Sequence, residues 1–559
     1  MSAERPAYPR LPVVAAFVVT ILGVLGVRLA YLGTVAADSI LAGVPEFELH
    51  AQRGSVWDRG GRLIATEHYV YSVYAAPYEV LDPGGFAAVL APYLGSSEGE
   101  IAGLVSDRSQ RWVTLSQEVP LPTARALESL SLSGLHLVRK AKRAYLMGAD
   151  AAHVTGFIDI EGRSFYGVEE HYDSLLRGQS GSYAGNFGSD PRAYRPPIDG
   201  SDLVLTIDSR IQRAAATELR EAIEQDNATG GTVIVMDPAT GAILASASWP
   251  TYDPGDYGNA DQQTFLDPAV SALYEPGSVL KAMTVASALD ASVVEPGWSY
   301  EDEGTITVDG LLISNWDGLP HGTTTLTKLL QYSLNVGAVH VAQEMGPDLF
   351  YSYLAAFGFG ATTGVDLANE AEGLVKWPDA TSDWYHGNLA TNSFGQGIAA
   401  TPLQVTAAMA AIANDGRLMR PHSVAAVIDS SGAIEPIRPQ PVRQVVSANT
   451  ARRVREMLAE VVSGRVTQAA IPGYSVGGKT GTSQIPTADG YEDEDTIASF
   501  GGFVPVQQPR LVILVKIDRP DSVRGGQAAA PVFKAVARVA LEVLDIQPDQ
   551  PIDLAGGQP

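Results

Sequence analysis

Ser278 and Lys281 are the first side chains in this sequence that could do chemistry, since a serine stands three residues before a lysine in EPGSVLKAMT. The EPG residues break the chain and 279–288 is mostly apolar, so we expect Ser278 to open a helix. A spacing of three then places Ser278 Oγ and Lys281 Nζ on one helix face, one turn apart. The helix N-terminus lowers the lysine pKa, and a neutral amine can make serine nucleophilic without histidine. Taken alone, the pair is equally consistent with a helix-capping serine and a solvated lysine.

The use of basic residues adds weight to Lys281. Only eight of the 38 basic residues are lysine, so the chain places arginine at most positions that require a positive charge. A lysine that must lose its proton cannot be replaced by arginine, because a guanidinium stays charged. Among the eight lysines, Lys281 is the one with a serine three residues earlier.

A second candidate lies in LLQYSLNVGAV, where Ser333 and Asn335 stand two residues apart. Two apolar stretches that we expect to be helical, 323–331 and 336–345, flank the pair, so both side chains can face one cleft at a helix junction. The hydroxyl can relay a proton and the amide can hold a peptide carbonyl. Taken alone, S-L-N is more simply a polar turn between helices.

Residues 473–482, GYSVGGKTGT, satisfy three signatures at once. G-x-x-x-x-G-K-T fits a phosphate-binding P-loop, G-x-S-x-G around Ser475 fits a nucleophile elbow, and K-T-G at Lys479 fits the third motif of penicillin-interacting enzymes. A P-loop requires a helix next, but SQIPTADGYEDED follows, with proline, glycine and acids. An elbow requires a later histidine, and the last histidine is His422. We therefore interpret the stretch as a sheet-edge strand whose lysine points into a cleft.

The three motifs occur in the order S-x-x-K, S-x-N, K-T-G, and with this set the chain resembles a class B penicillin-binding protein, most similar to the monofunctional division transpeptidases. The resemblance covers nearly the whole length. Two departures are small, since Val279-Leu280 replaces the usual Thr-Phe and Leu334 stands where serine is common. The stretches that carry the resemblance are RGSVWDRGGRLIAT, AHVTGF, GVEEHYDSLLRGQSG, EPGSVLK, SLN, FGQGIAATPLQ, GGKTGTSQ, SFGGFVP and AAPVFK.

The resemblance implies D,D-transpeptidation of peptidoglycan stem peptides through an acyl-serine intermediate, inhibited by β-lactams. It implies that Ser278 attacks the carbonyl of the penultimate D-Ala, that Lys281 accepts the serine proton, and that Ser333 passes a proton to the leaving amine. Asn335 would help to hold substrate and Lys281. The residues implied in binding the donor carboxylate are Lys479, Thr480, Gly481 and Thr482, and the backbone N–H groups of Ser278 and Thr482 would form the oxyanion hole.

The expected fold is α+β, a penicillin-binding transpeptidase fold with an antiparallel sheet packed between helices, preceded by an elongated pedestal domain. From residue 203 the pattern is regular. LVLTI is a strand, 208–225 is a helix capped by Asp208 with Ile211, Ala215, Leu219 and Ile223 on one face, and TVIVM and AILASAS form a hairpin joined at 237–241. A helical block follows, including TPLQVTAAMAAIANDG with Thr401 as its cap, and the last third returns to strands before a final helix from 531 to 546. The expected parts are a tail at 1–10, an anchor at 11–35, a pedestal or dimerisation-type domain at 45–200, a transpeptidase domain at 203–546 and a flexible tail at 547–559.

The N-terminal apolar run predicts on which side of a membrane the domains lie. Leu11 to Val27 is a run of 17 uncharged residues, preceded by Arg5 and Arg10, so the positive-inside bias puts the N-terminus in the cytoplasm and the catalytic domain outside a bacterial cell membrane. A cleaved signal peptide, cut after Val35-Ala36-Ala37, is the alternative interpretation.

The formal net charge of −25 argues against nucleic acid as a partner. An exported domain also has little nucleotide to bind.

The remaining expectations concern cofactors, partners, cellular role and alternative functions. The chain has no cysteine, so cysteine-ligated metals are excluded, and no metal or organic cofactor is expected. We expect β-lactams and stem peptides as ligands, and a membrane-embedded glycan polymerase and other divisome-type proteins as partners. A septal role is favoured over elongation because S-x-N followed by Val-Gly resembles the division and sporulation group. The alternatives are a D,D-carboxypeptidase or β-lactamase-type serine hydrolase on the same scaffold, and a catalytically silent β-lactam sensor.

Overall fold

The structure is a computed structural model that describes residues 11–34, 46–184, 194–379, 383–487, 490–521 and 525–551. The chain divides into two compact units. The first takes its described residues from 1–53 and 177–200, and the second from 54–176 and 201–559. The predicted cytoplasmic tail 1–10, the alternative cleavage site at 35–37 and residues 552–559 of the predicted C-terminal tail lie outside the described residues.

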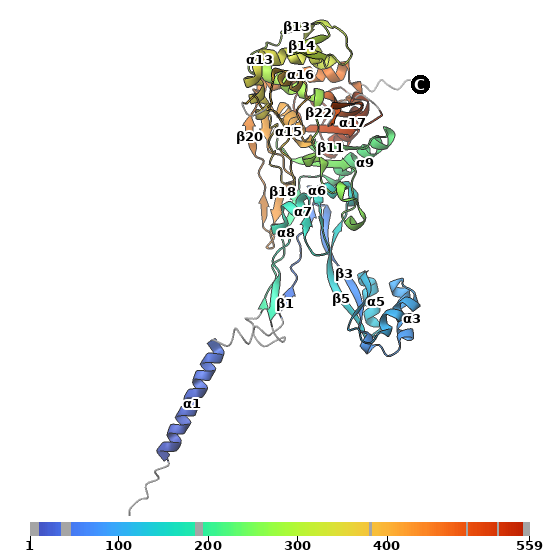
Figure 1. The fold of residues 1–559 in the computed structure, drawn as a ribbon, viewed down its shortest axis with the longest axis vertical. Helices are drawn as coiled ribbons and strands as arrows, with labels where there is room; N and C mark the ends of the chain where they lie inside the picture. The colour runs from blue at the N-terminus through green and yellow to red at the C-terminus, as the bar shows by residue number, and fades with distance from the viewer. Residues whose placement is uncertain are drawn as a thin grey trace, which may run out of the picture. The chain divides into compact units, whose positions relative to one another are not determined.

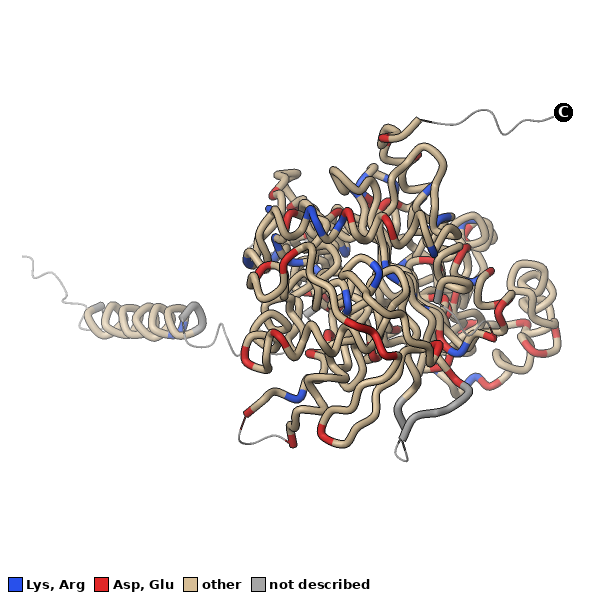
Figure 2. Tube along the Cα trace, turned by 90° about the horizontal axis from the view of Figure 1, so that it is seen from above, with Lys and Arg blue, Asp and Glu red and all other residues tan. Residues whose placement is uncertain are grey.

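The first unit contains helix α1 (Leu11–Thr34). Its segment Pro12–Tyr31 has a mean hydropathy of 2.4 and is long and apolar enough to cross a membrane. Figure 2 shows the helix without acidic positions. The predicted apolar helix is therefore confirmed. The same unit contains a small antiparallel sheet made by β1 (Glu46–Leu49), β8 (Gly181–Ala184) and β9 (Tyr194–Arg195).

In the second unit, a sheet of seven described strands joins strands from both sides of the predicted domain boundary at 200–203. The chain turns at 58–61, so that β2 pairs antiparallel with β3. The helices α3 (Pro83–Leu94), α4 (Glu98–Ser106) and α5 (Leu121–Ser129) pack beside β3 and β4 in a separate lobe (Figure 1). The strands are β2 (Val56–Trp57), β3 (Leu63–Ala75), β4 (Val113–Val119), β5 (Leu135–Tyr145), β10 (Asp202–Leu205), β18 (Val424–Ile428) and β19 (Ile434–Pro436).

A buried ion pair ties this region together. Arg143 of β5 donates from Nε to Glu169 of α7 (Gly167–His171) at 2.7 Å and from Nη1 to the carbonyl of Gly54 at 2.7 Å. The two side chains are 4% and 0% exposed. The planar guanidinium can donate to both acceptors at once. Three segments far apart in the chain therefore meet at Arg143.

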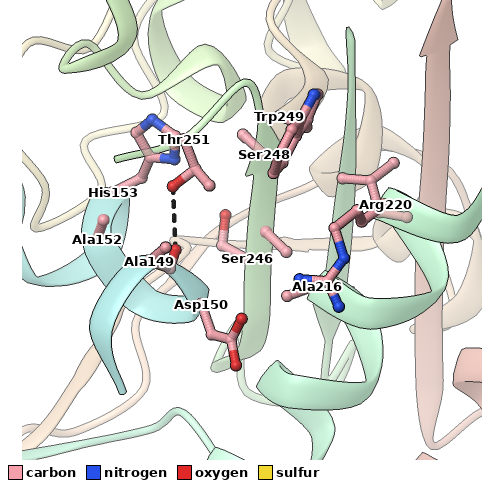
Figure 3. A pocket seen from close by; sticks show the side chains of 12 residues that line it. Ala149, Asp150, Ala152, His153, Ala216, Arg220, Ser246, Ser248, Trp249 and Thr251 are labelled. Atoms are coloured by element: carbon pink, nitrogen blue, oxygen red, sulfur yellow. Dashed lines mark hydrogen bonds between the residues drawn. The ribbon is translucent and has the colours of Figure 1, made fainter. Parts of the chain in front are cut away.

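Two other parts of the region before residue 200, the turn at Asp58 and the short helix that follows residue 151, pack against the helix α9 (Ser209–Gln225) and its neighbouring strand. Asp58 accepts from Ser209 N and from Ser209 Oγ, where α9 begins. The short helix α6 (Ala152–Thr155) and the turn before it lie against α9 and the strand β12 (Ile243–Trp249), around a small pocket (Figure 3). In this pocket Thr251 Oγ1 donates to the carbonyl of Ala149 at 3.0 Å (Figure 3).

Five described strands form one antiparallel sheet in the order β12-β11-β23-β22-β21, as the alternation of strands and helices predicts. The hairpin predicted at 237–241 joins β11 to β12. The strand β21, which carries K-T-G, lies at the edge of the sheet. The other strands are β11 (Gly230–Met236), β21 (Gly477–Thr487), β22 (Gly490–Val504) and β23 (Leu511–Asp518).

Helices cover both faces of this sheet (Figure 1). The helix α9 buries Ile211, Ala215, Leu219 and Ile223 on one face, as predicted, and its Asp208 cap accepts from Arg210 N. The helix α17 (Gly525–Val543) packs beside α9. On the other side lie α15 (Pro402–Ala413), capped by Thr401 as predicted, α16 (Ala448–Gly464), and the helices α11 (Lys281–Asp290), α12 (Leu326–Tyr332) and α13 (Asn335–Ala356).

Several boundaries differ from the prediction. The final helix begins at Gly525 instead of residue 531, because two glycines and three alanines precede Pro531 and give little periodic signal. The K-T-G strand begins at Gly477 instead of 473. It also continues through SQIPT to Thr487, because β21 and β22 stay paired as far as Thr487 and Gly490. Pairing with a neighbouring strand overrides the weak local β-propensity of this segment.

We predict that Glu169→Gln destabilises the protein by about 3–5 kcal/mol, because it leaves the buried Arg143 without its carboxylate. The matched control is Glu118→Gln, which breaks the exposed pair of Glu118 with Lys142 on the same strand β5. That pair is 45% and 41% exposed, so the loss should stay below about 1 kcal/mol. Denaturant unfolding of both variants measures the difference. Equal losses in the two variants would show that burial of the Arg143 pair does not matter.

Candidate active site

Ser278 lies in a 3₁₀ turn, Gly277–Leu280, that runs directly into α11 at Lys281. The predicted helix is confirmed, and its first turn is tighter than an α-helix. The turn packs against β21. Gly277 has φ 52°, and a Cβ there would lie 2.9 Å from the carbonyl oxygen of Thr482. The glycine before the serine therefore allows the turn and the K-T-G strand to approach each other closely.

Lys281 is completely buried, with 0% of its surface exposed. Its Nζ donates to the carbonyl of Ser333 at 2.6 Å and to Asn335 Oδ1 at 2.7 Å, and lies 3.4 Å from Ser333 Oγ. A neutral amine has two N–H donors and one lone pair. The two short contacts use both donors and leave the lone pair for a proton.

Ser333 connects the two active-site lysines. It ends α12 in the left-handed region, at φ 57° and ψ 44°, a conformation that costs a residue with a side chain about 1–2 kcal/mol. In this conformation its carbonyl accepts from Lys281, while its Oγ accepts from Lys479 Nζ at 2.9 Å. The S-L-N motif therefore contributes a backbone carbonyl as well as two polar side chains to the site.

Lys479 is 1% exposed and projects from β21 toward Ser333. Its Nζ also donates to the carbonyl of Thr480 at 3.1 Å and lies 3.5 Å from Thr480 Oγ1. No carboxylate contacts either lysine among the residues that the structure describes. The site thus presents an unneutralised cation to whatever binds there.

Burial lowers the pKa values of both lysines, and the charge of Lys479 lowers the pKa of Lys281 further. Burial first, and then the charge of Lys479, hold the pKa of Lys281 well below the ordinary lysine value. Burial alone lowers the pKa of Lys479 to about 7. Because the repulsion falls on Lys281, we assign the neutral amine to Lys281 and the ammonium, near neutral pH, to Lys479.

The remaining predicted residues lie on β21. Gly481 has no room for a side chain, since a Cβ would lie 2.4 Å from Ser499 Oγ and 2.9 Å from the carbonyl of Pro276. Thr480 and Thr482 flank it on the edge strand. The structure therefore brings all eight predicted site residues to one place, where the Ser278 turn, the α12–α13 junction and β21 meet.

Two contributions were not predicted from the motifs. The FGQG segment supports the serine turn from behind, because Gly277 N donates to the carbonyl of Gly395 at 3.2 Å and Gly397 N donates to Glu275 Oε1 at 2.9 Å. FGQG appears in the resemblance, but no spacing linked it to Ser278. The second contribution is the carbonyl of Ser314, which accepts from Asn335 Nδ2 at 3.0 Å and had no sequence signal.

Ser475, the serine of the rejected elbow signature, has structural partners instead. Its Oγ accepts from Val506 N at 2.9 Å and its hydroxyl bonds to Asp549, while its own N–H donates to Asp549 Oδ1 at 2.7 Å. These bonds hold the chain near the C-terminus against the start of the K-T-G segment. The described residues place no histidine against Ser475.

Comparisons with known proteins agree with this geometry. Residues 231–538 match the penicillin-binding protein transpeptidase domain, and residues 48–205 match the penicillin-binding protein dimerisation domain. Stage V sporulation protein D of Bacillus subtilis is 32% identical over 96% of this chain and 86% of its own. The peptidoglycan D,D-transpeptidase FtsI of Escherichia coli is 30% identical over 93% of this chain and 90% of its own.

Solved structures agree as well. Penicillin-binding protein 3 of Mycobacterium tuberculosis, complexed with aztreonam, has a TM-score of 0.71 and 28% identity, covering 90% of this chain and 99% of that one. The family models, the relatives and the fold all agree with the resemblance carried by the three motifs. The chain belongs to the class B penicillin-binding proteins and is a serine-type peptidoglycan D,D-transpeptidase.

Proposed function

We propose that Ser278 is the acyl-forming nucleophile of this transpeptidase, that Lys281 is its base, and that Ser333, Asn335 and the K-T-G strand bind and protonate the donor peptide. The observation that supports this most directly is the chain of contacts Asn335–Lys281–Ser333–Lys479, buried beside the Ser278 turn. Among the described residues, Ser278 Oγ has no side-chain hydrogen bond, so its hydroxyl is available to a substrate.

In acylation, Ser278 Oγ attacks the carbonyl carbon of the penultimate D-Ala, and its proton passes to the lone pair of Lys281 Nζ. The acceptors Ser333 O and Asn335 Oδ1 fix the two N–H bonds of that amine, so the lone pair is directed away from them. A positioned base of this kind contributes roughly 10²–10⁴-fold to the rate. The Lys281 ammonium then carries the proton for the next step.

The leaving D-Ala needs a proton on its nitrogen as the carbon–nitrogen bond breaks. Ser333 Oγ lies 3.4 Å from Lys281 Nζ and 2.9 Å from Lys479 Nζ, so it can take a proton from one side and give its own to the leaving amine. The acyl-enzyme ester then remains on Ser278. The amine of a second stem peptide attacks it, gives its proton back through Lys281, and forms the cross-link.

The charge at Lys479 gives the donor its orientation. The donor ends in a carboxylate, and Lys479, with the Thr480 and Thr482 hydroxyls, offers it a cation and two hydrogen-bond donors on an edge strand. Gly481 lets that strand pack closely against the Ser278 turn, because a side chain there would meet Ser499 Oγ and the carbonyl of Pro276. The N–H groups of Ser278 and Thr482 would stabilise the oxyanion, and losing one such donor typically costs about 3 kcal/mol of barrier. β-Lactams carry a carboxylate and a reactive carbonyl and would occupy the same groups.

We further propose a septal role, since FtsI is a peptidoglycan D,D-transpeptidase and S-L-N followed by Val-Gly resembles the division group, although the relatives include a sporulation protein. The helix α1 would anchor the chain with its N-terminus in the cytoplasm and residues 45–200 and 203–546 outside as pedestal and catalytic domains. A membrane-embedded glycan polymerase and other divisome-type proteins would be the partners, because cross-linking requires newly made glycan strands.

Ser278→Ala should abolish covalent labelling by a fluorescent penicillin, because it removes the hydroxyl that we propose attacks the β-lactam carbonyl. Intact-protein mass spectrometry should show the adduct on the parent and its absence in the variant. The matched control is Ser475→Ala, the serine of the alternative elbow signature, which should label like the parent. An adduct on Ser278→Ala, or its loss in Ser475→Ala with the fold intact, would overturn the assignment.

The acylation rate constant with benzylpenicillin should follow a bell-shaped pH profile. At low pH the rate falls because Lys281 becomes protonated and cannot accept the serine proton. As pH rises through about 7 it falls again, because Lys479 loses the charge that binds the carboxylate. In Lys479→Arg the alkaline limb near 7 should disappear, since a guanidinium stays charged. Stopped-flow kinetics from pH 5 to 10 measure this, and an unchanged alkaline limb in Lys479→Arg would contradict the role of Lys479.

Depletion of the protein in its own bacterium should give long cells without completed septa. A parental copy should restore division, whereas a Ser278→Ala copy should not, although it reaches the membrane in equal amount. Microscopy with a fluorescent D-amino acid measures cross-wall synthesis in both strains. Swollen, rounded cells would indicate elongation instead, and a defect confined to spore formation would indicate a role like that of the sporulation relative.

A further inference from the structure

The helix α13 starts at a catalytic position without a cap of its own. Asn335 is its first residue, and Leu334 occupies the N-cap position, at φ −75° and ψ 124°. These angles are those of a helix N-cap, but a leucine side chain has no oxygen to accept from the first free N–H groups. Leu334 is the position at which this chain departs from the serine common in the resembling family.

The missing acceptor comes from another element. Asn315 follows the strand β15 (Leu311–Ser314), and its Oδ1 accepts from Val336 N, the second residue of α13, at 3.1 Å. It is one of the two N–H groups that a capping serine at 334 could bind. Asn315 therefore caps α13 from 21 residues away in the sequence.

Asn315 is itself held in one orientation. Its Nδ2 donates to Asp302 Oδ1 at 2.8 Å, and Asp302 also accepts from Tyr300 Oη at 2.6 Å and from Gly304 N at 2.9 Å. Asp302 and Asn315 are 1% and 3% exposed. With its donor side committed to a buried carboxylate, Asn315 has only its oxygen to present to the helix.

A second tether runs beside the first. Ser314, the neighbour of Asn315, accepts through its carbonyl from Asn335 Nδ2 at 3.0 Å. Two consecutive residues at the end of β15 thus hold two consecutive residues at the start of α13. With its nitrogen bound to Ser314, the Asn335 amide can only direct Oδ1 at Lys281, which it does at 2.7 Å.

The first turn of α13 is fitted to this network as well. A Cβ at Gly337 would lie 2.5 Å from Tyr300 Oη and 2.7 Å from a methyl group of Leu329. The helix start therefore rests directly on the tyrosine that holds Asp302. Any rotation of this turn about the helix axis would break the Asn315 cap and move Asn335 together.

We propose that Asn315, oriented by Asp302 and Tyr300, is a positioning residue for the reaction: it supplies in trans the helix cap that Leu334 cannot, and so fixes Asn335 against Lys281. The proposal rests on the roles assigned above to Lys281 and Asn335. It predicts that the network affects the chemical step of acylation more than the binding of the β-lactam.

The test uses the full chain in detergent and a chromogenic cephalosporin, with stopped-flow kinetics separating the non-covalent dissociation constant from the acylation rate constant. Asn315→Ala should lower the acylation rate constant by about 10- to 100-fold, as expected for a misplaced catalytic group, with the dissociation constant changed by less than about threefold. Adding Leu334→Ser restores an acceptor for Val336 N. The double variant should therefore recover to within about threefold of Leu334→Ser alone.

Two controls separate positioning from general stability. Ser447→Ala removes the N-cap of α16, whose Oγ accepts from Thr450 N at 3.2 Å, and should leave the acylation rate constant unchanged. Tyr300→Phe keeps the ring and removes only the hydroxyl on Asp302, so a several-fold fall is expected even where Asn315→Ala folds poorly. The proposal is overturned if Tyr300→Phe and Asn315→Ala acylate like the parent, or if Leu334→Ser gives no recovery. Failure of the parent itself to acylate would instead overturn the proposed function.

Discussion

The structure depends on one unfavourable fact: the Lys281 amine is completely buried, and no carboxylate of the described residues contacts it. Removing an ammonium from water costs several kcal/mol, and the group avoids that cost by giving up its proton. The two acceptors that Lys281 has, a carbonyl and an amide oxygen, can each take an N–H without requiring a charge. Burial therefore does more than hide the lysine, since it lowers the lysine pKa and so favours the neutral amine that the proposed base requires.

The ends of the helices and strands around Lys281 hold those two acceptors in place. Ser333 adopts a left-handed conformation that a serine does not favour, and such a conformation persists only where the surroundings require it. The surroundings here are the ends of two helices, a strand end that caps one of them, and the edge strand that brings Lys479 to Ser333 Oγ. The close approach of the Ser278 turn to β21 needs a glycine at 277, where a side chain would strike Thr482. The proposed catalytic site thus lies where the ends of several helices and strands come together, and each end is held by a contact from another helix or strand.

Local signals in the sequence predicted the elements that are regular by themselves. The apolar spacing of Ile211, Ala215, Leu219 and Ile223 predicted α9, and Thr401 predicted the start of α15. The three motifs named every polar side chain that is within hydrogen-bond distance of Lys281 in the described structure. What spacing could not predict was how they are held, because each of those contacts crosses between distant segments. Nothing in ISNWDG marks Asn315 as the cap of a helix that starts 20 residues later, and the extension of β21 to Thr487 depends on pairing with β22.

The groups that contact a buried cation decide whether it keeps its charge. Arg143 lies against the carboxylate of Glu169, and Lys516 of β23, 5% exposed, is paired with Asp518. Either residue type can fill such a position, because the carboxylate stabilises the charge wherever it is buried. Lys281 and Lys479 lie instead on a hydroxyl, carbonyls and an amide. An arginine at 281 would keep its charge with nothing to neutralise it, whereas a lysine can lose it. Lys281 and Lys479 are therefore distinguished by burial without a carboxylate partner among the described residues, and of the two it is Lys281 whose pKa the neighbouring lysine charge lowers further.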